Sequence, residues 1–365
     1  MVAGAVLVVT CPCALSLATP AAMLAAAGAL ARGGVMVRKL QALEALADVD
    51  TLVFDKTGTL TRDAMVVEAI DVREGVSPDE ALAMAAALAR HSLHPVSRAL
   101  VVGHTNRESV PPGNRSWVCD AVTEAPGRGL SGLAASGHGG RDARTASLRL
   151  GSAVFCAVSA QHSSGLHSYL SDEQGWLATF SLAEDLRPQA ALAIASLAEL
   201  GVTVHMLSGD SVDSVARVAA LAGIAHTRGA CTPDDKLSCV RALQAQGHRV
   251  AMVGDGLNDG PVLAGANVSF AFGQAVPLAQ AKADFVVLGE KLMSVVHTVK
   301  LAQRTLRIVR QNLWWALVYN AACVPLAVIG LLPAWLAGLG MATSSLVVVL
   351  NALRLARNLN AEKAI

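Results

Sequence analysis

The chain has 365 residues, of which 53% are hydrophobic and 16% are charged, and its 29 Lys and Arg nearly balance its 28 Asp and Glu. A formal net charge of +1 excludes the broad basic surface of a nucleic-acid-binding protein. Seven scattered cysteines, an odd number, exclude a disulfide framework, and the length alone predicts two or three domains.

The first segment, residues 1–31, carries no charged side chain and is long enough to span a bilayer. It contains Cys11-Pro12-Cys13, in which the proline unwinds the helix locally, so that both sulfurs can face one ion. Soft thiolates favour Cu(I) and other thiophilic ions. A buried apolar pair or a disulfide is the alternative, but a disulfide between i and i+2 is geometrically poor. No Lys or Arg precedes the apolar run, which argues against a signal peptide. The basic, glycine-containing stretch 32–39 predicts a cytosolic stalk.

Asp55 opens the run DKTGTLT directly after the apolar, strand-like stretch 51–54. A strand delivers the aspartate to a sheet edge, and Gly58 lets the turn fold back close to a bound phosphate. Lys56 and the threonine hydroxyls can neutralise and hydrogen-bond the incoming oxygens. The pattern predicts a carboxylate nucleophile that carries a phosphoryl group and so divides a hard hydrolysis into two easier steps. An ordinary Asp at a strand-to-turn junction is the alternative.

Three more polar runs follow in order, each behind a strand-like segment. They are Ser208-Gly209-Asp210 after 202–207, Lys236 in the run TPDDK, and Asp255, Asn258 and Asp259 in the run GDGLNDGP after 251–253. The Ser208 hydroxyl can bind phosphoryl oxygens, and Lys236 would place a point charge on the phosphate. We expect all these groups at the carboxyl ends of strands, where doubly wound sheets bind their ligands. Phosphoryl transfer needs this positioning and charge neutralisation more than covalent help.

More than a hundred residues separate Asp55 from Ser208, too many for a loop within a compact domain. The insertion must therefore be a domain of its own. It opens with an Ala-rich stretch, 78–90, that predicts a helix, and continues with His91-Ser92-Leu93-His94-Pro95. A Gly/Arg/Ser-rich stretch around 131–148 shows only weak periodicity.

The C-terminal region predicts two more membrane spans. A charge-free region, 311–352, follows a basic segment that includes Lys300 and Arg310, and Arg354 and Arg357 come after it. Gly330 and Pro333 divide this region into two segments of spanning length. Positive residues at both outer ends place both ends in the cytoplasm, with the short turn outside.

Together these motifs resemble the P-type ATPases, from the first residues of the chain to its last helix. The resemblance implies an α/β haloacid-dehalogenase-like doubly wound phosphorylation domain with an inserted α+β nucleotide-binding domain, plus three transmembrane α-helices. It implies an aspartyl-phosphate formed by a set of catalytic residues: Asp55, Lys56, Thr57, Ser208, Gly209, Asp210, Lys236, Asp255, Asn258 and Asp259. Mg²⁺ would be held by Asp55, Thr57 and Asp255. The family more often has Thr at position 208, and Ser keeps the hydroxyl.

The Ser-x-His-Pro run resembles the nucleotide-domain signature of heavy-metal P-type ATPases, in which the His contacts the adenine end of ATP. The nucleotide-binding residues implied are His94, Pro95, Gly127, Gly129 and Gly151. Two positions depart from the family pattern: Ala89 stands where Glu is common, and Ser152 where Asn is common. Because both changes remove polar contacts, we expect an ATP site that is weaker by roughly several-fold to tens-fold.

The last two spans carry the metal assignment. The runs NLWWALVYN from Asn312 and MATSS from Met341 resemble the Cu(I) pattern of the heavy-metal group, whereas the zinc-type pattern would place a Lys and an Asp there. The implied copper ligands are Cys11, Cys13, Tyr319, Asn320, Met341 and Ser345. Interhelical hydrogen bonds for the Tyr and Asn, and packing for the Met, are the alternatives.

The resemblance predicts a division of the chain into five segments. These are a metal-site helix and stalk (1–46), the first segment of the phosphorylation domain (47–63), a nucleotide-binding domain (64–178), the second segment of the phosphorylation domain (179–298), and a transmembrane helix pair with a C-terminal tail (299–365).

The predicted function is ATP-driven Cu(I) translocation across a bacterial inner (plasma) membrane by a multi-pass protein with cytoplasmic catalytic domains. High Ala content and few Lys residues suggest a high-GC bacterium. The chain looks most like copper ATPases of cytochrome oxidase assembly, with a detoxifying exporter as the runner-up. We expect membrane lipid, the copper ion, and a copper chaperone or oxidase assembly proteins as partners, and no nucleic acid.

The Thr-Gly-Glu of the family's actuator loop does not occur in this sequence. We therefore expect the C-terminal portion of a transporter, with a missing N-terminal half, that does not complete a transport cycle alone. Two other classes stay open. One is a dehalogenase-type phosphatase, which phosphomonoester substrates would reveal, and the other is a non-catalytic fragment that only binds ATP or copper.

Overall fold

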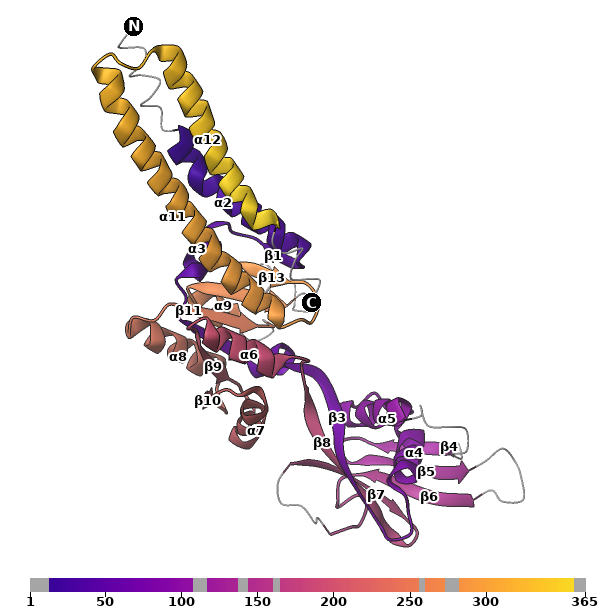
Figure 1. Ribbon diagram of the computed structural model, residues 1–365. Coiled ribbons are helices and arrows are strands. Elements are labelled where there is room, and N and C mark those ends of the chain that lie inside the picture. The colour runs from indigo at the N-terminus through magenta and orange to yellow at the C-terminus, as the bar shows by residue number, and fades with distance from the viewer. Residues whose placement is uncertain are drawn as a thin grey trace. The chain divides into compact units, whose positions relative to one another are not determined.

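The computed structural model describes residues 13–107, 117–136, 144–159, 165–255, 260–272 and 282–357, although not the side chains of 13–15, 63 and 144. The chain divides into two compact units (Figure 1). One is formed by residues 61–186, and the other by the segments before and after them.

A seven-stranded sheet forms the centre of the larger unit, with strand order β1-β13-β12-β11-β2-β9-β10. Its strands are β1 (Val35–Val37), β2 (Thr51–Asp55), β9 (Thr203–Leu207), β10 (His226–Arg228), β11 (Val250–Gly254), β12 (Val268–Phe272) and β13 (Phe285–Val287). All neighbouring pairs are parallel except β1 with β13. The described α-helices of this unit outside the long bundle include α3 (Gln41–Ala47), α6 (Ala190–Glu199), α7 (Val212–Ala222), α8 (Pro233–Ala245) and α9 (Gly260–Gly265).

Strand β2 lies between β11 and β9 and is buried throughout. Leu52, Val53 and Phe54 are all 0% exposed, as expected for a parallel strand that is covered on both faces. Parallel pairing sets Phe54 opposite Val253 on one side, and Asp55 opposite Leu207 on the other. The residues that follow these three strands therefore meet at one edge of the sheet, and the predicted doubly wound fold is confirmed.

In its described residues, the smaller unit is a six-stranded antiparallel sheet with two helices. Its strand order is β3-β8-β7-β6-β5-β4. The elements are β3 (Thr61–Val72), α4 (Pro78–Ala89), α5 (Pro95–Arg107), β4 (Trp117–Ala125), β5 (Gly129–Ser136), β6 (Arg144–Gly151), β7 (Leu166–Asp172) and β8 (Gly175–Leu186). Helix α4 buries its alanines and leucines against the sheet, which closes a core of its own. The predicted helix 78–90 is confirmed, and residues 61–186 form a compact unit where 64–178 was predicted.

The insertion leaves and rejoins the larger unit at adjacent residues. Within the larger unit the Arg187 amide donates to the Leu60 carbonyl at 2.9 Å. Within the smaller unit Thr61 pairs with Leu186, where β3 and β8 run antiparallel. The two ends of the insertion are thus held side by side.

Three long helices complete the larger unit: α2 (Cys13–Arg32), α11 (Met293–Val328) and α12 (Ala334–Arg357). They pack against one another, and α11 is one uninterrupted helix that also packs against α3 (Figure 1). Among the described helices, one segment, Ala334–Ala356, has the length and apolar composition to cross a membrane. The break between α11 and α12 falls at Ile329–Pro333, where Gly330 and Pro333 predicted it.

Candidate phosphoryl-transfer site

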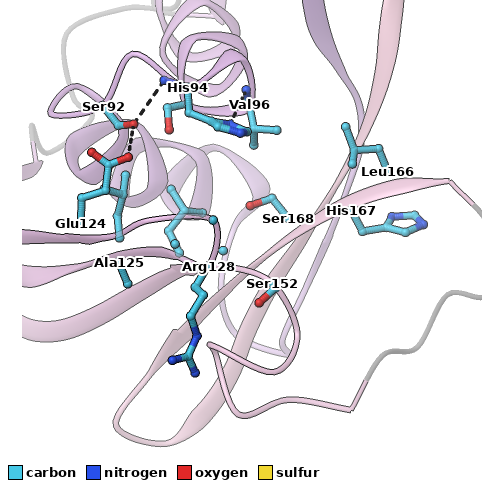
Figure 2. Close-up of a pocket in the computed structure, with 16 residues that line it drawn as sticks. Ser92, His94, Val96, Glu124, Ala125, Arg128, Ser152, Leu166, His167 and Ser168 are labelled. Atoms are coloured by element: carbon cyan, nitrogen blue, oxygen red, sulfur yellow. Dashed lines mark hydrogen bonds between the residues drawn. The ribbon is translucent and has the colours of Figure 1, made fainter. Parts of the chain in front are cut away.

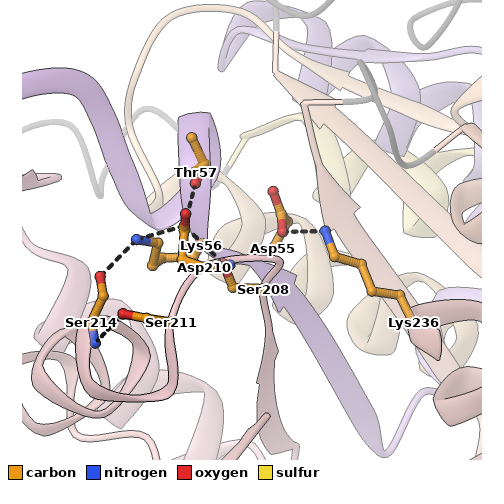
Figure 3. Close-up of polar contacts among 8 residues, drawn as sticks. All are labelled: Asp55, Lys56, Thr57, Ser208, Asp210, Ser211, Ser214 and Lys236. Atoms are coloured by element: carbon orange, nitrogen blue, oxygen red, sulfur yellow. Dashed lines mark hydrogen bonds and ion pairs between the residues drawn. The ribbon is translucent and has the colours of Figure 1, made fainter. Parts of the chain in front are cut away.

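Asp55 ends β2 with its side chain paired to a lysine from a distant region of the chain. The Lys236 Nζ lies 2.6 Å from Asp55 Oδ1, and both residues are 6% exposed (Figure 3). Lys236 lies in the first turn of α8, which begins with a capping box between Thr232 and Asp235. The prediction that every catalytic group directly follows a strand is therefore wrong for Lys236, which a helix N-terminus presents.

Asp210 is the centre of a second polar network, in the loop after β9. Its Oδ2 accepts hydrogen bonds from Lys56 Nζ at 2.7 Å, Thr57 Oγ1 at 3.1 Å and Ser208 Oγ at 3.0 Å. Lys56 is 1% exposed, and it also donates to Ser214 Oγ at 3.0 Å (Figure 3). The structure thus brings the predicted ammonium and hydroxyl groups around one carboxylate. Their direct contact with a phosphoryl group stays a prediction.

The same network keeps Asp210 ionised. Burial favours the neutral form of this carboxyl, but the hydrogen bond and charge of Lys56 and the hydroxyls of Ser208 and Thr57 outweigh it. The pKa of Asp210 is therefore below its ordinary value. Gly209 lies between Ser208 and Asp210, and a Cβ there would lie 3.4 Å from the Cys231 carbonyl oxygen.

The turn Lys56–Leu60 passes very close to Asp255, the residue that follows β11. Gly58 has a φ of +68°, and a Cβ on it would lie 2.7 Å from Asp255 Oδ2 and 3.2 Å from Asp255 Cβ. Only glycine combines this conformation with this approach. Asp255 therefore lies at the same edge of the sheet as Asp55.

The residues at this edge fit a magnesium ion. Mg²⁺ is usually held by one or two carboxylates and keeps phosphate oxygens and water as its other ligands. Asp55 and Asp255 supply two carboxylates from neighbouring strands, and Thr57 belongs to the turn that lies against Asp255. Within the described ranges no group of three or more His, Cys, Asp or Glu could hold a metal ion. Phosphate oxygens and water are the other ligands that Mg²⁺ usually takes.

Replacing Gly58 by alanine is expected to reduce phosphorylation of Asp55 roughly tenfold. The left-handed conformation costs the substituted residue roughly 1 kcal/mol, and the new methyl group forces Asp255 away from the turn. Gly201→Ala is the matched control, because Gly201 has a φ of +78° with nothing within 4 Å of its Cβ position. The measurement is the initial rate at which acid-stable, radiolabelled phosphate from ATP is incorporated into the chain. Equal losses of this rate in Gly58→Ala and Gly201→Ala would contradict the prediction.

Arg187 is a buried residue of this site that was not predicted from the sequence. It is 4% exposed, donates to the Gly58 and Thr59 carbonyls at 2.7 Å each and to the Glu290 carbonyl at 3.2 Å, and stacks over the Phe272 ring. The guanidinium thereby fixes the turn that follows Asp55. A single Arg before a Pro carries no recognisable pattern, so no signal in the sequence could have found it.

A cavity of about 270 Å³ lies in the smaller unit at the predicted nucleotide-binding residues. It is lined by His94, Gly127, Gly129 and Gly151 among others (Figure 2). The His94 Nδ1 accepts a hydrogen bond from the Val96 amide at 3.3 Å, so the ring is held at the start of α5, where Pro95 is the first helical residue. The structure therefore places four of the five predicted nucleotide-binding residues around one cavity, whereas Pro95 is not among its described lining residues. Contact with ATP stays a prediction.

Two of these glycines are required by the packing of the backbone. Gly129 and Gly151 pair directly between β5 and β6. A Cβ at Gly129 would lie 2.3 Å from the Leu150 carbonyl oxygen, and one at Gly151 would lie 2.2 Å from the Arg128 carbonyl oxygen. Gly127 has open space around it and a φ of +68°. Close strand packing alone thus explains Gly129 and Gly151, apart from any approach to a nucleotide.

One of the four predicted copper ligands on α11 and α12, Tyr319, lines a cavity of about 360 Å³ together with Cys323 and Ser344 among others. The other three predicted ligands, Asn320, Met341 and Ser345, do not line this cavity. A Cβ at Gly340 would lie 2.7 Å from the Tyr319 hydroxyl, so the two helices approach closely there. The copper roles of these residues stay predictions.

Asn312 belongs to the interhelical contacts. Its Nδ2 donates to the Val348 carbonyl at 3.3 Å and its Oδ1 accepts from Asn351 at 2.8 Å. Asn312 thus makes the kind of interhelical hydrogen bond that the sequence left open as an alternative for Tyr319 and Asn320.

Some predicted residues lie outside the described ranges of the chain. They are Cys11, Asn258 and Asp259. Cys13 begins α2, but its side chain is not described.

Comparison with known proteins agrees with this geometry. The family model of the haloacid dehalogenase-like hydrolases matches residues 49–267. The chain is 40% identical over 360 residues to the nitrogen fixation protein FixI of Rhizobium leguminosarum bv. viciae, covering 97% of this chain and 44% of that protein. It is 38% identical over 366 residues to a copper-exporting P-type ATPase of Mycobacterium tuberculosis (strain ATCC 25618 / H37Rv), covering 96% and 45%.

A solved structure agrees with these matches. It is a zinc-transporting PIB-type ATPase in the E2·Pi state, which superposes with a TM-score of 0.80 at 30% identity and covers 96% of this chain and 57% of that one. The chain spans about half the length of the curated relatives it matches. It belongs to the haloacid dehalogenase-like hydrolases and, within them, to the heavy-metal P-type ATPases.

Proposed function

We propose that the transporter to which this chain belongs moves Cu(I) across a bacterial inner membrane, driven by phosphorylation of Asp55 from ATP. The observation that carries the proposal is the arrangement around Asp55. Lys236 lies 2.6 Å from one carboxylate oxygen, and Ser208 and Asp255 follow the two neighbouring strands. A buried carboxylate that has a cation on one oxygen and hydroxyl donors nearby suits a phosphoryl acceptor.

Each group has a role in this proposal. The second oxygen of Asp55 attacks the γ-phosphorus of ATP, the aspartyl-phosphate forms and ADP leaves. Lys236 neutralises charge as the phosphoryl group arrives, and the Ser208 hydroxyl donates to a phosphoryl oxygen. Bound Mg²⁺ would neutralise the transferring group, held by Asp55 and Asp255. The ordered turn after Asp55 keeps the nucleophile at the sheet edge.

The membrane assignment is supported by the outer surface of the helix bundle. Large apolar side chains on α11, α12 and the turn between them are exposed, including Trp314 at 66%, Leu331 at 70% and Trp335 at 71%. Such a surface suits lipid better than water. We propose that α2, α11 and α12 all span the membrane, with both sheet units in the cytoplasm.

Copper specificity rests on the side chains of these helices. The apolar stretches of α11 and α12 contain no carboxylate, and a divalent ion in a thiolate site needs compensating carboxylates more than a monovalent ion does. Cys11, Cys13, Tyr319, Asn320, Met341 and Ser345 remain the proposed ligands. The copper-exporting relative agrees with this choice. A copper chaperone or oxidase assembly proteins are the proposed partners, and the rest of the transporter would supply the actuator function.

The test is incorporation of radiolabelled γ-phosphate from ATP into the detergent-purified chain, with and without Cu(I). We expect an acid-stable, hydroxylamine-sensitive label that Asp55→Asn abolishes, because the amide is not a nucleophile toward phosphorus. Copper dependence of the label would link the helix bundle to the sheet. A folded chain that binds ATP without labelling would overturn phosphorylation by this chain, and labelling by small phosphomonoesters in place of ATP would favour a phosphatase.

A further inference from the structure

The cavity of the smaller unit has one acidic side chain among its described lining residues, Glu124 near the end of β4. Its Oε1 accepts a hydrogen bond from Ser92 Oγ at 3.0 Å, and the same Ser92 Oγ accepts from the His94 amide at 3.2 Å (Figure 2). Ser92 is 9% exposed, so the carboxylate is oriented by a nearly buried hydroxyl. Glu124 is thereby fixed beside the residues that lead into α5.

The cavity is electrically asymmetric. Arg128 extends from the turn between β4 and β5 in a direction away from Glu124 (Figure 2). A nucleoside triphosphate has a strongly anionic end and a base that can donate hydrogen bonds. Because like charges repel, the phosphates cannot lie against Glu124, and a carboxylate near a bound nucleotide is tolerated only where a donor faces it. The base of the nucleotide therefore belongs at the Glu124 side.

The orientation of the carboxylate favours a base that presents a single donor group. Guanine would present two neighbouring N–H donors, which need both carboxylate oxygens side by side. Here the Ser92 hydroxyl already takes one acceptor position of Oε1, so a base that needs only one donor contact fits better. The 6-amino group of adenine is one such donor, whereas guanine carries a carbonyl oxygen at that position. Ala89 is buried in the core, with 1% of its surface exposed, and its side chain has no polar atom. It therefore offers a bound base no hydrogen bond.

We propose that Glu124 is a specificity-determining residue of the ATP site, whose carboxylate accepts a hydrogen bond from the 6-amino group of adenine. Ser92 positions that carboxylate, and His94 lines the same cavity. The inference rests on the proposed function, because it takes the cavity as the ATP site.

The test compares two ligands that differ only in that amino group, ATP and purine riboside 5′-triphosphate. Their affinities for the full chain in detergent are measured by displacement of a fluorescent ATP analogue. We expect Glu124→Ala to weaken ATP about tenfold and purine riboside triphosphate less than about twofold, because a hydrogen bond to a charged group is lost only with ATP. Glu124→Gln, which keeps an acceptor oxygen without the charge, should lie between the wild type and Glu124→Ala.

Glu74→Ala is the matched control, since Glu74 is an exposed carboxylate of the same unit that does not line the cavity. Equal losses for both ligands in Glu124→Ala would show that Glu124 acts through Ser92 and the loop alone, and would overturn the proposal, as would no loss for ATP. Thermal unfolding of the variant checks that the unit remains folded.

The outcomes separate this inference from the proposed function. If the wild type labels on Asp55 and Glu124→Ala binds ATP normally, the inference alone fails. If the wild type binds ATP with the amino-group dependence described but never labels, the proposed phosphorylation fails and the inference stands. A wild type that binds neither ligand would overturn both.

Discussion

Replacing Lys236 by methionine is expected to reduce phosphorylation of Asp55 about a hundredfold or more, and to destabilise the larger unit by roughly 3–5 kcal/mol. The Lys236 Nζ lies 2.6 Å from Asp55 Oδ1, and both side chains are less than 10% exposed. Without the ammonium, the carboxylate keeps its desolvation cost and loses a cation that offsets it. The variant therefore loses both charge neutralisation during transfer and stability at rest. Labelling rates and thermal unfolding measure the two effects.

A double variant separates the two contributions. Lys236→Met combined with Asp55→Asn removes both charges, so it should recover much of the lost stability and still fail to label. Lys291→Met is the control, because Lys291 is an exposed lysine at the start of the segment leading into α11. A single Lys236→Met variant that kept more than about a tenth of the labelling rate would show that Lys236 is not required for transfer.

Replacing Arg187 by alanine is expected to lower the midpoint of thermal unfolding by roughly 5–15 °C, with a matching loss of labelling. Three carbonyl oxygens, those of Gly58, Thr59 and Glu290, lose a buried charged donor, and Phe272 loses its stacked partner. The turn after Asp55 then has no fixed conformation. The measurement is thermal unfolding of the purified chain alongside the labelling rate.

Arg187→Lys is informative because lysine keeps the charge and loses the planar fork of donors. It should recover less than half of the lost stability. Arg217→Ala, on the exposed face of α7, is the matched control and should unfold like the wild type. If Arg187→Ala were phosphorylated at the wild-type rate despite a lower unfolding midpoint, the hydrogen bonds of Arg187 to the turn after Asp55 would serve stability alone.

Much of the catalytic edge could be predicted because its signals are local. Asp55, Ser208 and Asp255 each follow an apolar run, and the structure makes those runs the central parallel strands. Parallel order then places their carboxyl ends together. Lys236 does not follow this rule. The strand before it, β10, is short and ends at Arg228, and Lys236 belongs instead to the first turn of the capped helix α8.

Other features of the site depend on contacts that no local pattern encodes. Arg187 meets the turn after Asp55 only because the chain returns from the insertion at that point. Glu124 meets Ser92 only because β4 lies beside the segment between α4 and α5. The weakly periodic stretch around 131–148 overlaps strands β5 and β6, whose many small residues hide the alternation of a half-buried strand. Such features become visible only in the folded chain.

The pairing of the two ends of the insertion has a consequence for how this chain folds. To form its central sheet, the larger unit must join β2 to β9 across everything between residues 61 and 186. A disordered connection of that length would make the search slow. If the insertion condenses first, β3 and β8 bring Thr61 beside Leu186, and the long connection becomes in effect a very short one. Early folding of the smaller unit would then bring β2 and β9 together and so speed formation of the central sheet of the larger unit.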